Sequence, residues 1–425
     1  MAESTIHVYK GTIVQAPSLG ALESTEAAYL VTESGRIAGV FDKLPGKYQN
    51  AACEDFGDCL IVPAFTDLHL HAPQYCMMGM GFDLPLLEWL NAYTFREEAR
   101  FADAGFARTV YEALAAELVR RGTTRVCMFS SLHREGTLIL MDALERAGIV
   151  GYVGKVNMDR NSPDFLCETC EESLAETRRW LEECVGRFTR VKPILTPRFT
   201  PSCSDALLEG LGVLAEEYGV LVQSHLSEND AEVAWVRELH PDCVQYWETY
   251  AKFGLWKPGT IMAHCVHSDA RERAAMRASG VWVAHSPDSN TNLYSGIAPV
   301  RKMLSEGLNV ALASDVAGGA KLSMLHVAAE AIRASKLRYY YSGKRQDEAF
   351  LTVPEAFYLA TSAGQQYFGV GAGFRPGDAL HAVVLDDAAF PPSRPLTPAE
   401  RLERLLYADD AGAIRAVIGE GRRLL

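Results

Sequence analysis

Several residues that can bind a metal ion are spread along the middle of the chain. His69 and His71 lie two residues apart, and His225, His264 and Asp315 follow much later. Side chains two apart on an extended strand point to the same face, so both imidazoles can bind one cation. A His-x-His pair alone is a weak signal, because such pairs are as often exposed or hydrogen-bonded residues. The later histidine and aspartate favour the metal interpretation.

The residue types indicate which metal and which chemistry to expect. The predicted ligands are His69, His71, His225 and Asp315. Three neutral imidazoles and one carboxylate suit a borderline cation, so we expect one zinc ion, with iron or manganese as alternatives. A divalent cation lowers the pKa of a bound water molecule from 15.7 to about 7, which makes hydroxide available at neutral pH. The pattern therefore predicts a metal-dependent hydrolase.

Such a hydrolase also needs groups that move protons, and Glu228 is the candidate. It lies three residues after His225, where its carboxyl group can protonate a ring nitrogen and then a leaving ammonia. The alternative is a helix cap or first-turn acid, because residues 227–230 all suit the start of a helix. Asp315 can also accept a proton from the attacking water. We expect His264 to contact the water or the substrate rather than to be a fourth imidazole ligand.

These residues need a scaffold that brings distant parts of the chain together. Short β-branched apolar runs alternate with longer amphipathic segments, which is typical of βα units around a parallel sheet. Eight such units predict a TIM barrel, whose active site lies at the C-terminal ends of its strands. The candidate residues come at or just after the ends of the runs, as do His267 and His285, which we interpret as surface or structural residues. The runs begin at Leu60, Thr123, Val150, Val191, Val220, Thr260, Val281 and Asn309.

The two ends of the chain have a different pattern. They contain short alternating stretches such as IHVYKGTIVQ and HAVVLDD, separated by Gly, Asp and Pro turns. We expect both ends to pair into one small β-sandwich beside the barrel. The predicted domains are residues 1–59 for the first part of the sandwich, 60–368 for the barrel, and 369–425 for the rest of the sandwich with a terminal helix and strand.

Composition narrows the classes of function. The 425 residues are 48% hydrophobic, which is enough for a large core. The net charge of -13 argues against a nucleic-acid partner, because phosphate backbones bind to clustered Lys and Arg. We see no leader-like segment and no apolar run of membrane length, so we expect a soluble cytoplasmic protein with no membrane partner. The ten cysteines are then expected to be reduced, and the pair Cys167 and Cys170 is interpreted as incidental, with a zinc or redox role as the alternative.

On these residues the sequence resembles the amidohydrolase superfamily, whose members combine a metal-binding TIM barrel with a small β-sandwich. More narrowly, five stretches are similar to the branch of that superfamily that deaminates guanine. The resemblance implies hydrolytic deamination of guanine to xanthine and ammonia in purine metabolism, with one zinc ion per subunit and a homodimer. The five stretches are HLHAPQY, DLPLLEWLNAYTFREEARF, RFTPSCS, SHLSEN and SDVAGG.

The same resemblance implies a set of residues that bind the substrate. Gln74 and Arg198 would read the base, because an amide offers a donor and an acceptor and a guanidinium fork suits a carbonyl oxygen with its adjacent nitrogen. Phe199 would pack on the purine face. Trp89 would close the pocket, unless it is only a buried aromatic of a helix. The implied substrate contacts are Gln74, Trp89, Arg198, Phe199, His225 and Glu228.

One position departs from the pattern of this branch, and two alternatives remain open. Asp288 stands where the resemblance leads us to expect Asn in a Pro-Asn-Ser-Asn stretch, and its charge is expected to alter the rim or the substrate fit. A relative acting on another amino-heterocycle, such as 8-oxoguanine, cytosine or an s-triazine, would keep the metal ligands and change Gln74 and Arg198. A catalytically inactive scaffold protein would have lost at least one ligand, whereas this chain has them all.

Overall fold

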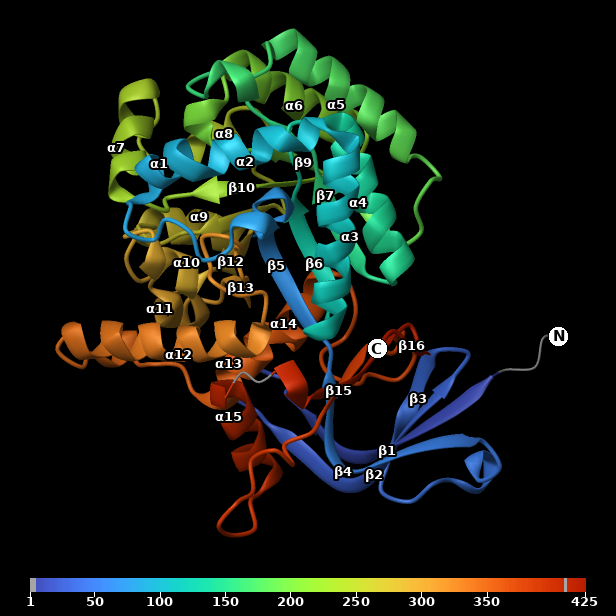
Figure 1. The fold of residues 1–425 in the computed structure, drawn as a ribbon. Helices are drawn as coiled ribbons and strands as arrows, with labels where there is room; N and C mark the ends of the chain where they lie inside the picture. Colours follow the sequence, from blue (N-terminus) through green and yellow to red (C-terminus); the bar gives the residue numbers. More distant parts are fainter. Residues whose placement is uncertain (1–4, 409–410) are drawn as a thin grey trace.

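The largest part of the structure is a barrel of eight parallel strands surrounded by helices (Figure 1). The structure is a computed structural model that describes residues 5–408 and 411–425. The first and last strands approach through two backbone hydrogen bonds, from Asp315 N to His69 O (2.9 Å) and from His71 N to Val316 O (3.0 Å). The predicted TIM barrel is therefore confirmed. In sheet order the strands are β5 (Phe65–His71), β6 (Thr123–Phe129), β7 (Val150–Gly154), β9 (Val191–Pro197), β10 (Leu221–Leu226), β11 (Ile261–His264), β12 (Trp282–His285) and β13 (Asn309–Leu312), with the short β8 (Val156–Asn157) paired to β9.

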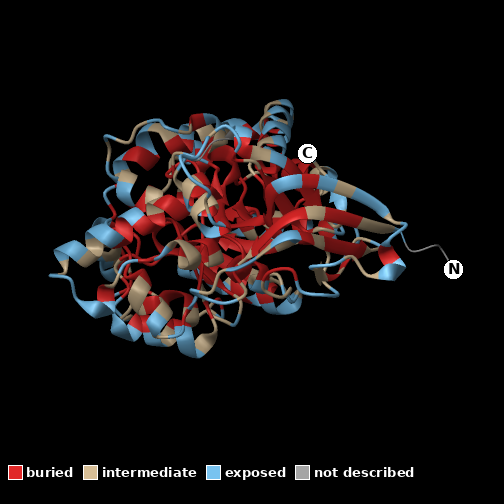
Figure 2. Ribbon diagram, turned by 90° about the horizontal axis from the view of Figure 1, so that it is seen from below, coloured by how far each residue is buried: buried red, intermediate tan, exposed pale blue. Residues whose placement is uncertain are grey.

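The sequences of the barrel strands are mostly apolar runs because both faces of each strand are buried. Every residue of β5 and β6 is buried, as expected for parallel strands enclosed by helices. Figure 2 shows the buried residues gathered inside the molecule and the exposed ones on the outer helices. Among these helices, α4 and α9 end at Gly148 and Gly280, whose φ angles of 75° and 67° are the left-handed values that glycine adopts at helix ends. The outer helices are α3 (Ala104–Arg120), α4 (Arg134–Ala147), α5 (Cys170–Cys184), α6 (Asp205–Glu217), α7 (Asp230–Leu239), α8 (Glu248–Ala251), α9 (Ala270–Ser279), α10 (Pro287–Asn292), α11 (Val300–Ser305), α12 (Met324–Tyr341), α13 (Val353–Ala360) and α14 (Ser362–Tyr367).

A helical segment between β5 and α3 lies at the C-terminal end of the barrel, where the strands end. It consists of a 3-10 turn η2 (Ala72–Met77), α1 (Leu86–Trp89), a wider π-helical turn η3 (Leu90–Thr94) and α2 (Phe95–Ala99). Its apolar side chains pack into the main core, and Leu86 and Trp89 of α1 line the pocket at the barrel mouth. The segment thus forms one wall of the candidate site. None of the helices in the described ranges is long and apolar enough to cross a membrane.

The two ends of the chain pair into a separate seven-stranded sheet. Successive side chains of its strands point to opposite faces of the sheet, so they pack against different cores. Ile61 and Val384 belong to a core within this sheet, whereas Leu60 and Leu385 point the other way and join the barrel core. The sheet order is β16 (Arg422–Arg423), β15 (Ile414–Gly419), β14 (Ala382–Leu385), β4 (Ala52–Pro63), β1 (Ile6–Gln15), β2 (Glu23–Glu33) and β3 (Arg36–Phe41).

The start of the first barrel strand differs from the sequence expectation. Leu60 does not begin a barrel strand, because residues 60–63 pair with β14 in the terminal sheet. The barrel strand begins at Phe65, after a single residue, Ala64. Both stretches are buried and apolar, so periodicity alone could not separate them. The predicted terminal helix is present as α15 (Pro398–Ala408), while residues 1–4 and 409–410 of the two predicted terminal segments lie outside the described ranges.

His381, where the terminal sheet meets the base of the barrel, makes stability depend on pH. Burial, with Arg125 and Arg190 nearby, holds the pKa of His381 well below its usual value, and its Nδ1 contacts Thr124 Oγ1 at 2.9 Å. Below about pH 6.5 the unfolded chain binds a proton at this histidine and the folded chain does not, so the free energy of unfolding falls as pH falls.

We expect His381→Asn, which cannot titrate, to lose less stability than the parent between pH 7.5 and pH 5. Each pH unit between the two pKa values is worth at most about 1.4 kcal/mol. Thermal unfolding of both proteins at the two pH values measures the difference. Equal losses in the two proteins would show that His381 is solvated in the folded state.

Candidate active site

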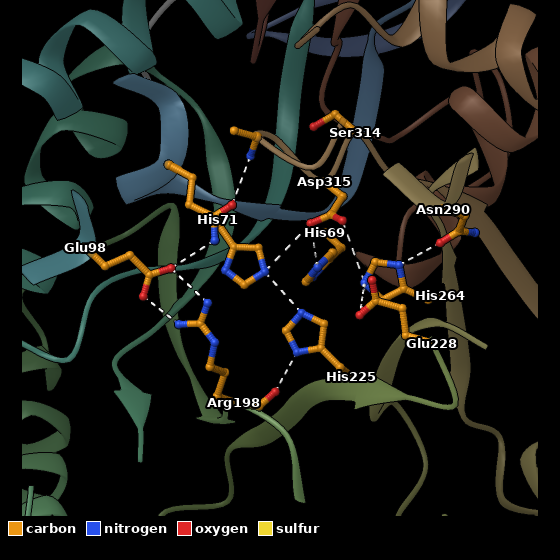
Figure 3. A network of polar contacts seen from close by, with 12 residues as sticks. His69, His71, Glu98, Arg198, His225, Glu228, His264, Asn290, Ser314 and Asp315 are labelled. Carbon is orange, nitrogen blue, oxygen red and sulfur yellow. Dashed lines mark hydrogen bonds and ion pairs between the residues drawn. The ribbon is translucent and has the colours of Figure 1, made fainter. Parts of the chain in front are cut away.

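The predicted metal ligands, distant in sequence, converge at one end of the barrel (Figure 3). His69 Nε2 lies 3.1 Å from Asp315 Oδ1, and His71 Nε2 lies 3.7 Å from the same oxygen. His71 Nε2 is also 3.1 Å from His225 Nε2. All four side chains are buried. The four predicted ligands therefore lie together at the strand ends, and their role as metal ligands stays a prediction.

The tautomer of His225 leaves an unprotonated ring nitrogen in the cluster. His225 Nδ1 donates to the backbone oxygen of Arg198 at 2.5 Å, so its Nε2 carries no proton and faces His71. Within the described ranges, both ring nitrogens of His69 and Nδ1 of His71 are buried without a hydrogen-bond partner. Burial lowers the pKa of His69, His71 and His225, which keeps these rings neutral. Neutral imidazoles gathered in this way, with buried nitrogens that lack partners, fit a cation between them.

Asp315 supplies the negative charge of the cluster. Burial alone raises its pKa, but the nearby imidazoles of His69 and His264 outweigh this effect and hold the pKa at about 2. The carboxylate is therefore ionised at neutral pH. Among the residues that the structure describes, two groups of three have ligand atoms within 4.8 Å of one another, and both contain His69. The first group is His69, His225 and His264, and the second is His69, His71 and Asp315.

Asp67 holds the two ligand-bearing segments together, and the sequence analysis missed it. It accepts hydrogen bonds from Ser314 N at 2.9 Å, Ser314 Oγ at 2.5 Å and His69 N at 3.4 Å. Because Ser314 immediately precedes Asp315, this buried carboxylate ties the end of β13 to β5. Its signal in the sequence was its position in TDLHLH, on the same strand face as His69 and His71.

Backbone strain is concentrated around the same cluster. His264, Asp315 and Ser227 have φ angles of 71°, 48° and 47°. Side chains other than glycine rarely adopt this left-handed region, and each instance costs on the order of 1 kcal/mol. The surrounding packing must compensate for this cost, because all three residues are buried.

Glu228 faces the metal cluster rather than capping a helix. Helix α7 is capped by Asn229, with Glu232 completing a capping box, so the cap alternative for Glu228 is excluded. Its Oε2 lies 3.5 Å from His264 Nε2. Burial, with the negative charges of Glu232 and Asp315, raises the pKa of Glu228 well above its usual value. A buried carboxyl group of this kind can hold a proton at neutral pH.

His264 is oriented by a neighbour on α10. Its Nδ1 lies 2.9 Å from Asn290 Oδ1. Because an amide oxygen only accepts, Nδ1 carries the proton and Nε2 points at Glu228 and at Asp315, which is 3.7 Å away. His285 and His267 are not among the residues that line the pocket. His285 is buried, and His267 contacts the backbone oxygen of Ser295.

A pocket that is partly open to solvent lies beside the cluster. Trp89 and Phe199 line it, and Trp89 Nε1 donates to Met80 O at 2.8 Å, so this tryptophan is both a buried helix residue and a wall of the pocket. The apolar walls suit a planar ring, and the polar groups lie at two opposite parts of the lining. The lining residues are His71, Gln74, Leu86, Trp89, Leu90, Arg198, Phe199, His225, Glu228, His264, Leu293, Asp315 and Gly318.

Gln74 and Arg198 lie in this pocket, but their polar atoms are engaged differently from the sequence expectation. The fork of Arg198 binds Glu98, with Nη1 to Oε2 at 2.5 Å and Nη2 to Oε1 at 3.0 Å. Gln74 Nε2 donates to Glu98 at 2.9 Å, and Gln74 Oε1 accepts from Ala317 N at 3.1 Å. The expected free acceptor of Gln74 and free fork of Arg198 are thus already bound. The sequence analysis did not single out Glu98, because Glu97 beside it has the same side chain.

Asp288, the departure from the expected pattern, turns away from the substrate cavity. Its Oδ2 accepts from Ala320 N at 2.7 Å and lies 3.4 Å from His326 Nε2. Its Oδ1 accepts from Asn292 at 3.3 Å. The charge therefore anchors the loop that follows Asp315, and it does not line the pocket.

The fold and this cluster define a class of protein. A TIM barrel with a separate terminal sheet carries histidines and an aspartate at its strand ends, in the geometry of a mononuclear metal site. Residues 60–424 match the amidohydrolase family, and the chain belongs to that family.

Individual relatives extend this finding over nearly the whole chain. A guanine deaminase of Dictyostelium discoideum is 36% identical over 383 residues, which are 86% of this chain and 84% of that protein. A guanine deaminase of Homo sapiens is 36% identical over 400 residues, which are 90% of this chain and 87% of that protein. The crystal structure of guanine deaminase from C. acetobutylicum with guanine bound in its active site has a TM-score of 0.96 and 41% sequence identity, covering 99% of this chain and 100% of that chain.

We expect Asp288→Ala to loosen the loop after Asp315, because Ala320 N then loses its acceptor. Loss of one such hydrogen bond costs about 1 kcal/mol of stability. Asp288→Asn is the matched control, since it keeps an acceptor and removes only the charge. Thermal unfolding and metal content report the effect. If the Ala and Asn variants are equally stable, the bond to Ala320 does not anchor the loop.

Proposed function

We propose that this protein is a zinc-dependent hydrolase that converts guanine and water into xanthine and ammonia. The observation that carries the proposal is a pocket with N–H donors of Gln74 and Arg198 on one side and the His–Asp cluster with Glu228 on the other. Its apolar walls suit a planar heterocycle. The relatives named guanine deaminase, over most of the chain, support the choice of guanine.

His69, His71, His225 and Asp315 would hold the metal. A divalent ion bound there would supply a water-derived nucleophile at neutral pH by lowering the pKa of that water. Zinc suits three neutral imidazoles and one carboxylate, although iron accepts the same ligands. We assign His264 to the water or the substrate, because Asn290 leaves its unprotonated Nε2 pointing at Asp315 and Glu228.

Proton transfers follow from the two carboxyl groups. Asp315, ionised in the folded protein, accepts a proton from the attacking water. Glu228, whose raised pKa favours the protonated form, donates to the ring nitrogen beside the amino-bearing carbon. The proton taken from water then reaches the amino group and ammonia leaves, while the remaining hydroxyl proton returns to Glu228 as the carbonyl of xanthine forms. Phe199 and Trp89 hold the ring plane while these transfers occur.

The two alternative functions fit the site less well. An inactive scaffold would not keep buried ring nitrogens without hydrogen-bond partners and a buried acid beside them, since each unpaired polar group costs stability. A hydrolase for another amino-heterocycle would have the same predicted metal ligands. Only the residues that line the pocket would distinguish it from a hydrolase for guanine.

We also propose a cytoplasmic homodimer, which the resemblance to this branch of the family implies. Four large apolar side chains are exposed on the single chain at the end of α12 and shortly after it, namely Leu337, Tyr340, Tyr341 and Phe350. Burial of such a patch between subunits would remove apolar area from water. Light scattering of the purified protein measures the mass.

We expect His71→Ala to lose stoichiometric metal and at least about a thousandfold in activity, because the metal supplies the nucleophile. The control is His7→Ala, a histidine on β1 of the terminal sheet that leaves the barrel intact. Elemental analysis and a guanine assay measure both effects. A His71→Ala protein with full metal content would remove this residue from the ligand set.

We expect Glu228→Gln to retain metal and lose about 10²–10⁴-fold in kcat, the usual contribution of an acid–base group. Glu209→Gln, an exposed residue of α6, controls for the chemical change. Full activity of the Glu228 variant would exclude it as the proton carrier.

The substrate itself is tested by following ultraviolet absorbance with guanine, adenine, cytosine, 8-oxoguanine and melamine. We expect kcat/KM for guanine to exceed the others by about 10²-fold or more, because wrong bases leave buried polar groups unpaired. A clear preference for another base would transfer the assignment to that base.

A further inference from the structure

Glu98 is a buried anion that joins the two residues at the polar end of the pocket. It lies on α2 and is 1% exposed. Its Oε2 accepts from Arg198 Nη1 at 2.5 Å, while its Oε1 accepts from Arg198 Nη2 at 3.0 Å and from Gln74 Nε2 at 2.9 Å (Figure 3). One carboxylate therefore receives three N–H groups, and it lines no part of the cavity itself.

The first consequence is a defined orientation of the Gln74 amide. Its nitrogen is held by Glu98 and its oxygen by the backbone N–H of Ala317 at 3.1 Å. A flipped amide would place its oxygen against the carboxylate and its NH₂ group against another N–H, so both contacts would become repulsive. The group that Gln74 has left for the pocket is therefore its second N–H.

The second consequence concerns Arg198. The bidentate contact balances its charge and uses one N–H of each terminal nitrogen, which leaves only N–H donors for a ligand. Its guanidinium also lies over the ring of Phe95, 5.1 Å from the ring centroid, which restricts its movement. Since the charge is paired, this end of the pocket offers donors without a net positive charge.

We propose that Glu98 is a positioning residue that determines specificity. By holding Gln74 and Arg198, it makes their end of the pocket a surface of N–H donors. This donor surface selects neutral heterocycles that place an oxo group against it. A substrate with an amino group at the same place would set donor against donor. The paired charge likewise gives no advantage to an anionic ligand. This inference rests on the proposed function, because it concerns the same pocket.

Two purines test the rule directly. Guanine and 2,6-diaminopurine share the 2-amino group that is lost, but the 6-oxo acceptor of guanine is an amino donor in 2,6-diaminopurine. Sites built to form a specific hydrogen bond reject analogues that cannot form it, because buried groups are then left unpaired. The ratio of kcat/KM for guanine to kcat/KM for 2,6-diaminopurine therefore measures how strongly the Gln74–Arg198 end of the pocket prefers an acceptor to a donor.

The experiment compares Glu98→Gln with the parent enzyme. The amide that this substitution introduces would turn N–H groups toward Arg198 and release Gln74, so we expect the guanine to 2,6-diaminopurine ratio to fall by about thirtyfold or more. The KM for guanine should rise more than kcat falls, and metal content should not change, because the reacting end is untouched. Glu97→Gln is the matched control. Glu97 is the preceding residue of the same helix, partly exposed and paired with Arg100, and its variant should keep the parent ratio.

Glu98→Asp covers the case in which Glu98→Gln does not fold. It keeps the charge that balances Arg198, but its carboxylate is one methylene shorter and cannot reach both partners. We expect an intermediate ratio. The inference is overturned if the ratio in Glu98→Gln lies within about threefold of the parent ratio. If Glu98→Gln does not fold, the same criterion applies to Glu98→Asp.

A combined variant separates positioning from a general structural role. If Glu98 acts through Gln74 and Arg198, adding Glu98→Gln to a protein that already carries Gln74→Ala and Arg198→Gln should change the ratio by less than about threefold, whereas independent effects would multiply. Multiplying effects would overturn the inference. The proposed function fails on a different result, namely a parent enzyme that does not deaminate guanine.

Discussion

The structure depends on one constraint: three neutral imidazoles and one ionised carboxylate are held against one another inside a buried space. His71 Nε2 and His225 Nε2 lie 3.1 Å apart, and Asp315 brings a full negative charge to the same point. Such an arrangement is costly without a cation, so the rest of the barrel must hold it in place. The strained backbone at His264 and Asp315 is part of that cost.

Closure of the barrel meets the constraint through backbone and buried carboxylate contacts. Asp67 joins the first strand to the segment before Asp315, and Asp288 anchors the segment after it. Ligands from the first and last strands are thereby fixed relative to each other, although more than two hundred residues separate them in the chain. The terminal sheet supports the opposite end of the barrel, where Leu60 and Leu385 enter its core.

Polar residues behind the pocket wall complete the site. Buried side chains that never touch a ligand set the orientation of those that do, as Asn290 does for His264 and Glu98 for Arg198. In a cavity with little water, an amide or imidazole that turned over would lose its partners, so each position has one stable orientation. The pocket thus distinguishes between ligands by the donors and acceptors that its lining residues have left after binding the buried residues behind them.

The sequence by itself determined the barrel and the terminal sheet strands, and it predicted which histidines and which aspartate lie together at the strand ends. Periodic apolar runs and the His-x-His spacing are local patterns, and local geometry is sufficient to interpret them. Only the tertiary structure decided that residues 60–63 leave the barrel, that Asn229 rather than Glu228 caps α7, and that Glu98 rather than Glu97 is buried against Arg198. The physical reason is that pairing partners, burial and hydrogen-bond direction depend on residues far away in the chain, which no spacing between neighbours encodes.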